Sequence, residues 1–143
     1  MSNGPSKDRS RWTIVLYLLN FSLLFTHEID SAFWREWELF GLPGGIQVFL
    51  LLNFLLLLLA LYGFRRLLQG AKSGYGFSLV LAGAGLFAFF IHSYFILKGH
   101  EEFTLPASLI LLMLILIASL VQAIFALRAL LEFGKRDPET PDR

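Results

Sequence analysis

The sequence NFSLLFTHEIDSAFWREWELF, residues 20–40, joins an apolar segment to a group of ionisable side chains and then to tryptophans. At about 100° per residue, five side chains fall on one broad helical face: Asn20, His27, Asp30, Ser31 and Trp34. On that face Asp30, three residues on, is a better partner for His27 than the adjacent Glu28. Ionisable groups at the end of a membrane span are costly, and they indicate a functional site.

The composition is that of an integral membrane protein. Of the 143 residues, 56% are hydrophobic, and the mean hydropathy of +0.65 is too high for an ordinary soluble domain. The sequence has no cysteine, which excludes disulfides, zinc–thiolate sites, iron–sulfur clusters and a cysteine nucleophile. A formal charge of +1 gives no reason to expect a nucleic-acid partner.

Four apolar stretches have the length of about 20 residues that a helix needs to cross a bilayer. They are residues 12–31, 45–64, 76–97 and 103–127. Short connections join them, so we expect one all-α transmembrane domain, residues 12–127, folded as an antiparallel four-helix bundle. Residues 1–11 and 128–143 are polar and are expected to form tails.

The basic residues predict how the bundle is oriented. Ten of the twelve Lys and Arg lie in the two tails and in the loop between the second and third spans. The positive-inside rule therefore predicts a multi-pass protein of a bacterial or archaeal cell membrane, with both termini in the cytoplasm. In that orientation His27, His92 and His100 all lie towards the outer side.

The third span carries small residues at helical spacing. Ala84, Ala88 and His92 repeat every four positions, with Gly85 beside them, and small residues allow helices to approach closely in lipid. This spacing directs His92 towards another helix. We expect His27 and His92 to share a site, and rings more than ~10 Å apart would exclude a shared ion because metal–nitrogen bonds are about 2 Å long.

These residues predict an outward-facing pocket between the first and third spans. We expect His27, Asp30 and His92 to bind a divalent metal, most simply zinc, because imidazole and carboxylate suit zinc, manganese or iron. Asp30, Glu36 and His100 are the candidate catalytic residues. A metal-bound water becomes a nucleophile near neutral pH, so the predicted function is a membrane-embedded hydrolase acting on a lipid or other amphiphile.

The surroundings of this pocket are also predicted. Asn20 should form its floor, and Trp34 and Trp37 its roof. Four polar side chains in the spans should hydrogen-bond between helices: Asn20, Ser22, Gln47 and Asn53.

Simpler interpretations exist for each of these residues. His27 and Asp30 also suit an interfacial helix end, His92 suits a hydrogen bond across the bundle, and His100 suits a solvated loop. Two other functions remain open. His27 and His92 could ligate a haem from both sides, or His27 and Asp30 could relay protons in a small transporter or accessory subunit. The partners would then be the lipid bilayer and a homo-oligomer or larger membrane complex.

Several short motifs carry a resemblance to known proteins. The pattern HEID at residues 27–30, WREWELF at 34–40, PGGIQ at 43–47, and later His92 and Gly99-His100, resembles a family of small bacterial and archaeal membrane proteins of unknown function. The resemblance covers most of the chain and implies four helices and a membrane location. It does not point to any particular activity. A looser similarity links the chain to the HXXEE membrane family, which has two glutamates where this chain has Asp30-Ser31.

Overall fold

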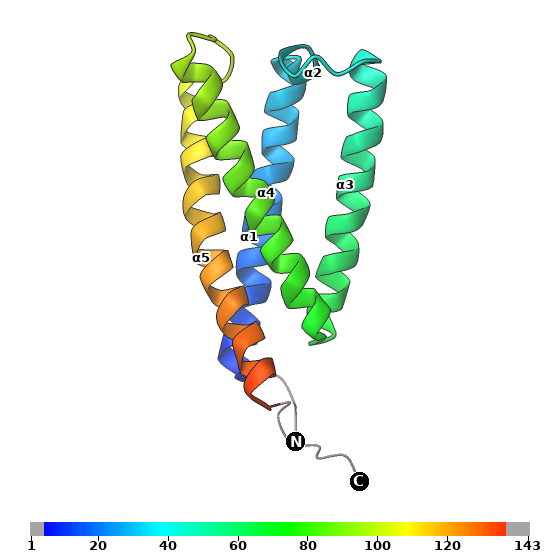
Figure 1. Cartoon of the computed structure of the whole chain (residues 1–143), viewed down its shortest axis with the longest axis vertical. Coiled ribbons are helices and arrows are strands. Elements are labelled where there is room, and N and C mark those ends of the chain that lie inside the picture. Colours follow the sequence, from blue (N-terminus) through cyan, green and yellow to red (C-terminus); the bar gives the residue numbers. More distant parts are fainter. Residues whose placement is uncertain (1–4, 137–143) are drawn as a thin grey trace.

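The computed structural model describes residues 5–136 of the chain, and these residues fold into helices (Figure 1). The helices are α1 (Lys7–Phe33), α2 (Glu36–Leu39), α3 (Gly45–Leu68), α4 (Lys72–Leu97) and α5 (Pro106–Arg136). Within the described residues, all except the short α2 are long and apolar enough to cross a membrane. The predicted all-α membrane bundle of four helices is therefore confirmed.

The first and last helices, α1 and α5, extend beyond the spans that hydropathy predicts. α1 begins at Lys7, because the Ser6 hydroxyl accepts the backbone N–H of Arg9 at 3.4 Å and caps the helix. Arg9 then forms an ion pair with Glu132, which lies in the continuation of α5. Parts of both expected tails are thus helical, and residues 1–4 and 137–143 of those tails lie outside the described residues.

The helices do not pack evenly around one axis. Figure 1 shows α4 crossing the molecule diagonally, so that it lies beside α5 at one end and beside α3 at the other. α1 packs mainly against α5 and much less against α3. α3 therefore stands apart from α1 along much of its length, joined to it at one end by the turn that contains α2.

Close packing between α4 and α5 depends on a glycine. A β-carbon on Gly85 would overlap the Ser119 hydroxyl, so a side chain here would require Ser119 to move. Gly85, Ala88 and His92 are all buried on this face of α4. The prediction that His92 faces another helix is confirmed, but Ala84 is exposed, because it lies to the side of the contact.

A buried polar network connects the middle of the bundle. The Asn20 amide nitrogen donates to Ser119 Oγ at 3.0 Å and to Gln122 Oε1 at 2.7 Å. Gln122 in turn donates to the Ser78 carbonyl of α4 at 3.0 Å. Asn20 thus bonds between helices as predicted, about two turns below His27.

The Asn53 side chain also bonds between helices as predicted, since it hydrogen-bonds with Glu28 of α1, but the prediction for Ser22 is wrong. Ser22 donates to the Leu18 carbonyl at 2.8 Å, and the Asn53 amide donates to the Phe49 carbonyl at 3.1 Å. Both carbonyls belong to the same helix four residues earlier, where a short polar side chain finds an acceptor without a partner helix. Gln47 is exposed near the start of α3.

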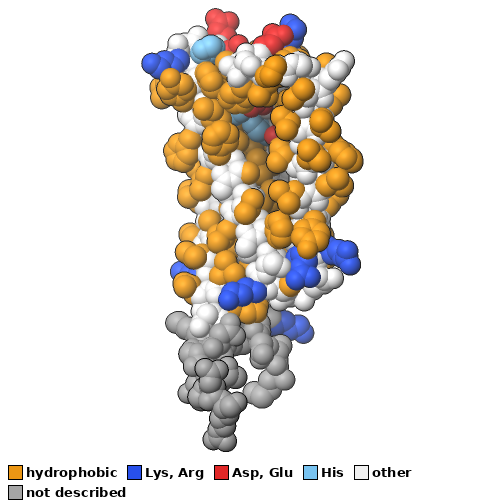
Figure 2. Space-filling model, turned by 45° about the vertical axis from the view of Figure 1, so that its right-hand side comes forward, with side chains coloured by type: hydrophobic (Ala, Val, Ile, Leu, Met, Phe, Trp, Pro, Cys, Tyr) orange, Lys and Arg blue, Asp and Glu red, His pale blue; other side chains and the backbone are white. Residues whose placement is uncertain are grey.

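The two ends of the bundle differ in charge. Figure 2 shows acidic and histidine side chains gathered at one end, an apolar band below them, and most of the visible Lys and Arg side chains towards the other end. This distribution agrees with the predicted orientation, in which the basic end faces the cytoplasm.

Candidate metal centre

His27 of α1 and His92 of α4 form a buried pair. Their Nε2 atoms lie 3.0 Å apart and their ring centroids 4.7 Å apart, with the rings inclined at 73°. The two residues are only 2% and 1% exposed. The rings thus lie well inside the ~10 Å limit for a shared ion, since metal–nitrogen bonds are about 2 Å long.

Glu36 is brought to this pair by a reversal of the chain. Arg35 adopts the left-handed conformation, with φ 53°, so the helix axis breaks and α2 folds back at the end of α1. Glu36 Oε1 then lies 3.6 Å from His92 Nε2. One ligand atom from each of His27, Glu36 and His92 lies within 4.8 Å of the others.

The environment of Glu36 affects its charge. Burial raises the pKa of the Glu36 carboxyl above its ordinary value and outweighs the opposite effect of the Ser31 hydroxyl. The Asp30 carboxylate adds a smaller increase to the same pKa. A cation beside Glu36 would offset this cost of burying its charge.

Phe103 covers the histidine pair. Its ring centroid lies 4.0 Å from the His92 ring and 5.7 Å from the His27 ring, and the residue is 1% exposed. Its φ of 64° is unusual for a bulky residue. Backbone strain of this kind costs on the order of 1–3 kcal/mol and clusters at functional sites.

The family assignment can now be made. The model of a family of unknown function, DUF6713, matches residues 13–129, which include both histidines and Glu36. The chain belongs to this family. We found no match among curated proteins and none among solved structures.

The predicted roof of the DUF6713 site is only partly formed by the expected residues. Trp34 lies over Phe103, with 6.1 Å between ring centroids. Trp37 packs instead on Phe49 of α3, at 5.3 Å, because the turn at Arg35 carries it away from α1. Sequence reasoning did not select Phe103, since nothing in the sequence distinguishes it from the other fourteen phenylalanines.

Asp30 takes a different place from the one predicted. Its Oδ1 accepts a hydrogen bond from the Ser108 hydroxyl of α5 at 3.0 Å, and Asp30 is not in the group of ligand atoms around the histidines. Its Oδ2 is buried and lacks a hydrogen-bond partner among the described residues, as do the Nδ1 atoms of His27 and His92. The carboxylate closest to the pair is therefore that of Glu36.

His100 also lies away from the pair. It belongs to the loop between α4 and α5, where its Nδ1 lies 3.4 Å from Glu102 Oε2 and its ring packs on Phe95. Its side chain is 44% exposed. A role for His100 in catalysis stays a prediction.

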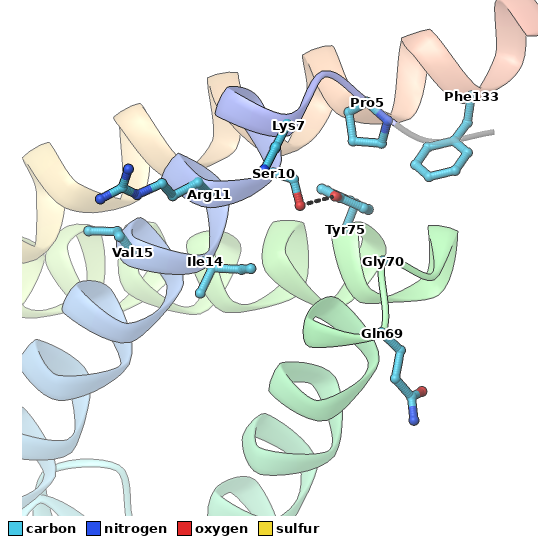
Figure 3. A pocket seen from close by; sticks show the side chains of 10 residues that line it. All are labelled: Pro5, Lys7, Ser10, Arg11, Ile14, Val15, Gln69, Gly70, Tyr75 and Phe133. Carbon is cyan, nitrogen blue, oxygen red and sulfur yellow. Dashed lines mark hydrogen bonds between the residues drawn. The ribbon is translucent and has the colours of Figure 1, made fainter. Parts of the chain in front are cut away.

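A cavity of about 700 Å³ occupies the opposite end of this DUF6713 chain, near the start of α1 (Figure 3). Lys7 and Arg11 line it on one side and Gln69 on another, and the Tyr75 hydroxyl donates to Ser10 Oγ at 3.1 Å. It lies at the basic end, far along α1 from His27, and has no part in the histidine centre.

Proposed function

We propose that this protein binds a divalent transition-metal ion through His27, His92 and Glu36. The observation that carries the proposal is the approach of the two Nε2 atoms to 3.0 Å. Two nitrogen ligands of one tetrahedral zinc ion lie about 3.3 Å apart, given zinc–nitrogen bonds of about 2.0–2.1 Å. The pair therefore needs only a small movement to accept an ion between its nitrogens.

The ligand set supports zinc and an open coordination position. Two imidazoles and one carboxylate are the protein ligands of several catalytic zinc sites, in which water takes the fourth position. Zinc lowers the pKa of such a water to about 7. This supports a hydrolase acting on an amphiphile, because the centre lies near the end of membrane-spanning helices.

Two further residues belong to this proposal. Asp30 is our candidate for orienting His27, since Asp30 Oδ2 and His27 Nδ1 are both buried without partners among the described residues, one helical turn apart. His100 is the candidate base at the rim. We further propose a cell-membrane location with this centre at the outer face, which the gathering of basic side chains at the other end supports (Figure 2).

The geometry gives less support to haem. Two histidines on opposite sides of one iron would hold their nitrogens about 4 Å apart, with the macrocycle between the rings. Here the separation is 3.0 Å, and the Phe103 ring lies against His92.

A proton relay has one observation in its favour. At 3.0 Å the two Nε2 atoms can share a hydrogen bond, and Glu36 continues the chain of titratable groups. Such a chain suits a small transporter or an accessory subunit.

Metal analysis of the detergent-purified protein separates these functions. We expect about one zinc ion per chain after dialysis against zinc, with loss of that ion in both His27→Ala and His92→Ala. A Soret band would support haem instead. A colourless protein that binds no added divalent ion would reject the metal proposal and favour the relay.

A further inference from the structure

A groove of about 510 Å³ lies between α1, α3 and α4. Its volume is within the range of small-molecule binding sites, about 300–1,000 Å³. Its walls are mostly leucine and phenylalanine, and its polar groups are few: Glu28 of α1 and Asn53 of α3 face it, and Tyr17 lies at its far end. The Tyr17 hydroxyl already donates to the Ala60 carbonyl at 2.7 Å, so Glu28 and Asn53 form the polar end.

The length of the groove fits one lipid chain. Tyr17 and Glu28 both line it and are eleven residues apart on α1, which corresponds to about 16 Å of helix. The hydrocarbon core of a bilayer is about 30 Å thick. The groove therefore spans about one leaflet.

Glu28 has an amide donor beside it, because the Asn53 side chain hydrogen-bonds to it from α3, but it has no cationic partner in the described part of the chain. It is half-buried beside the groove, and it forms no ion pair with another residue in the described part of the chain. One amide donor uses only part of the acceptor capacity of a carboxylate, and a carboxyl group at this depth is costly without further donors or a cation. Glu36 of the metal centre is close enough to interact with it electrostatically, and that interaction is repulsive.

We infer that this groove binds a single-chain amphiphile whose head group donates hydrogen bonds, a hydroxyl or an amine. The hydrocarbon chain lies between α1 and α3, and Glu28 accepts a hydrogen bond from the head. This inference rests on the proposed function in one respect: Glu28 interacts electrostatically with Glu36, so the head lies near the metal centre and the amphiphile is the substrate class.

A second copy of the chain would not satisfy Glu28 in the same way. The helix that borders the groove, α3, has no charged residue between positions 45 and 64. Packing α3 of another copy into the groove would place leucine and phenylalanine side chains against the carboxyl.

Photo-crosslinking tests the inference on the full chain in lipid nanodiscs. The probes are hexadecanol, hexadecylamine and hexadecanoic acid, each with a diazirine in the middle of the chain, and labelled residues are mapped by mass spectrometry. We expect saturable labelling of α1 and α3 residues of the groove by the alcohol and the amine. The acid should label about tenfold less, because its carboxylate faces that of Glu28.

Two variants make the result specific. Glu28→Gln should remove most of the discrimination against the acid, a change that a structural role of Glu28 would not produce. Ala84→Phe should abolish groove labelling, because Ala84 lines the groove. Gly83→Phe is the matched control on the same helix, since Gly83 borders open space and not the groove.

Metal content measured on the same samples separates the two proposals. Zinc binding that depends on His27, combined with uniform labelling of all lipid-facing helices, would overturn the groove and leave the metal centre. Saturable groove labelling in a chain that binds no zinc would overturn the metal centre and leave the groove. Cross-links between α3 helices of two chains, or equal labelling by all three probes, would also overturn the groove.

Discussion

The Nε2 atoms of His27 and His92 lie 3.0 Å apart, although 65 residues separate them in the sequence. The pair is buried under Phe103 and approached by Glu36, so three groups that could hold a metal ion, from α1, α2 and α4, meet at one end of the bundle. Nothing else in the described residues gathers three such side chains around one point.

Removing the Glu36 carboxylate should weaken metal binding without abolishing it. In Glu36→Gln the two imidazoles remain, but the charge that favours a cation is lost, so we expect zinc affinity to fall at least about tenfold. Competition with a zinc-binding dye measures this. Glu38→Gln is the control, because Glu38 is exposed and pairs with Arg35. Equal affinities in the two variants would contradict the role of Glu36.

Acidification should weaken zinc binding, since the ligands bind metal only when deprotonated. Burial raises the pKa of Glu36, so its contribution should be lost at a higher pH than for an ordinary carboxyl group. A zinc titration at several pH values, repeated with Glu36→Gln, measures that contribution as the difference between the two curves. If zinc affinity depended on pH in the same way in the native chain and in Glu36→Gln, the contribution of Glu36 would be contradicted.

In the metal-free chain the contribution of Glu36 should depend on pH in the opposite direction. Its contribution to the free energy of unfolding should be larger at low pH than at high pH. Because the pKa of Glu36 is raised on folding, the folded state holds this proton more tightly than the unfolded state. Its contribution to the free energy of unfolding is therefore complete below the ordinary pKa of the carboxyl and is lost as the pH rises through the raised value. Thermal unfolding of the zinc-free protein, compared with Glu36→Gln, checks this sign.

Phe103 should protect the centre from water and chelators. Phe103→Ala is expected to cost about 3–5 kcal/mol of stability, as for other buried phenylalanines, and to accelerate zinc removal by EDTA. Stopped-flow chelation measures the rate. Phe90→Ala serves as the control, since Phe90 is 63% exposed. If EDTA removed zinc at an unchanged rate from a folded Phe103→Ala protein, Phe103 would not be the group that limits access to the centre.

Gly85 should be intolerant of a side chain. Gly85→Ala would push against Ser119 and disturb its bond to Asn20, which we expect to cost about 1–3 kcal/mol. Gly83→Ala on the same helix meets open space and should stabilise by up to about 1 kcal/mol. Thermal unfolding in detergent compares them, and equal shifts would contradict the close contact between α4 and α5.

The architecture was predictable because it depends on composition and spacing. The lengths of the apolar stretches predicted the four spans. The spacing of small residues before His92 correctly predicted that this side chain faces into the bundle. The helix ends were less predictable. The cap at Ser6 and the ion pair between Arg9 and Glu132 extend the outer helices into polar sequence, where hydropathy gives no signal.

The candidate site could be predicted only in part from helical spacing. Helical spacing put His27 and Trp34 on one face of α1 and directed His92 into the bundle, but it did not show where that face ends. The left-handed turn at Arg35 ends that face, so Glu36 approaches the histidines and Trp37 turns to α3. A non-glycine residue in this conformation is rare, and nothing in the local sequence indicates it.

The most direct test of the central claim is an X-ray absorption spectrum at the zinc edge of the loaded, detergent-purified protein. We predict two imidazole ligands per zinc at about 2.0–2.1 Å with oxygen completing the shell, and one imidazole or no bound zinc in His27→Ala and in His92→Ala. A zinc ion with no imidazole ligand, or a shell unchanged in both variants, would contradict a metal centre shared by His27 and His92.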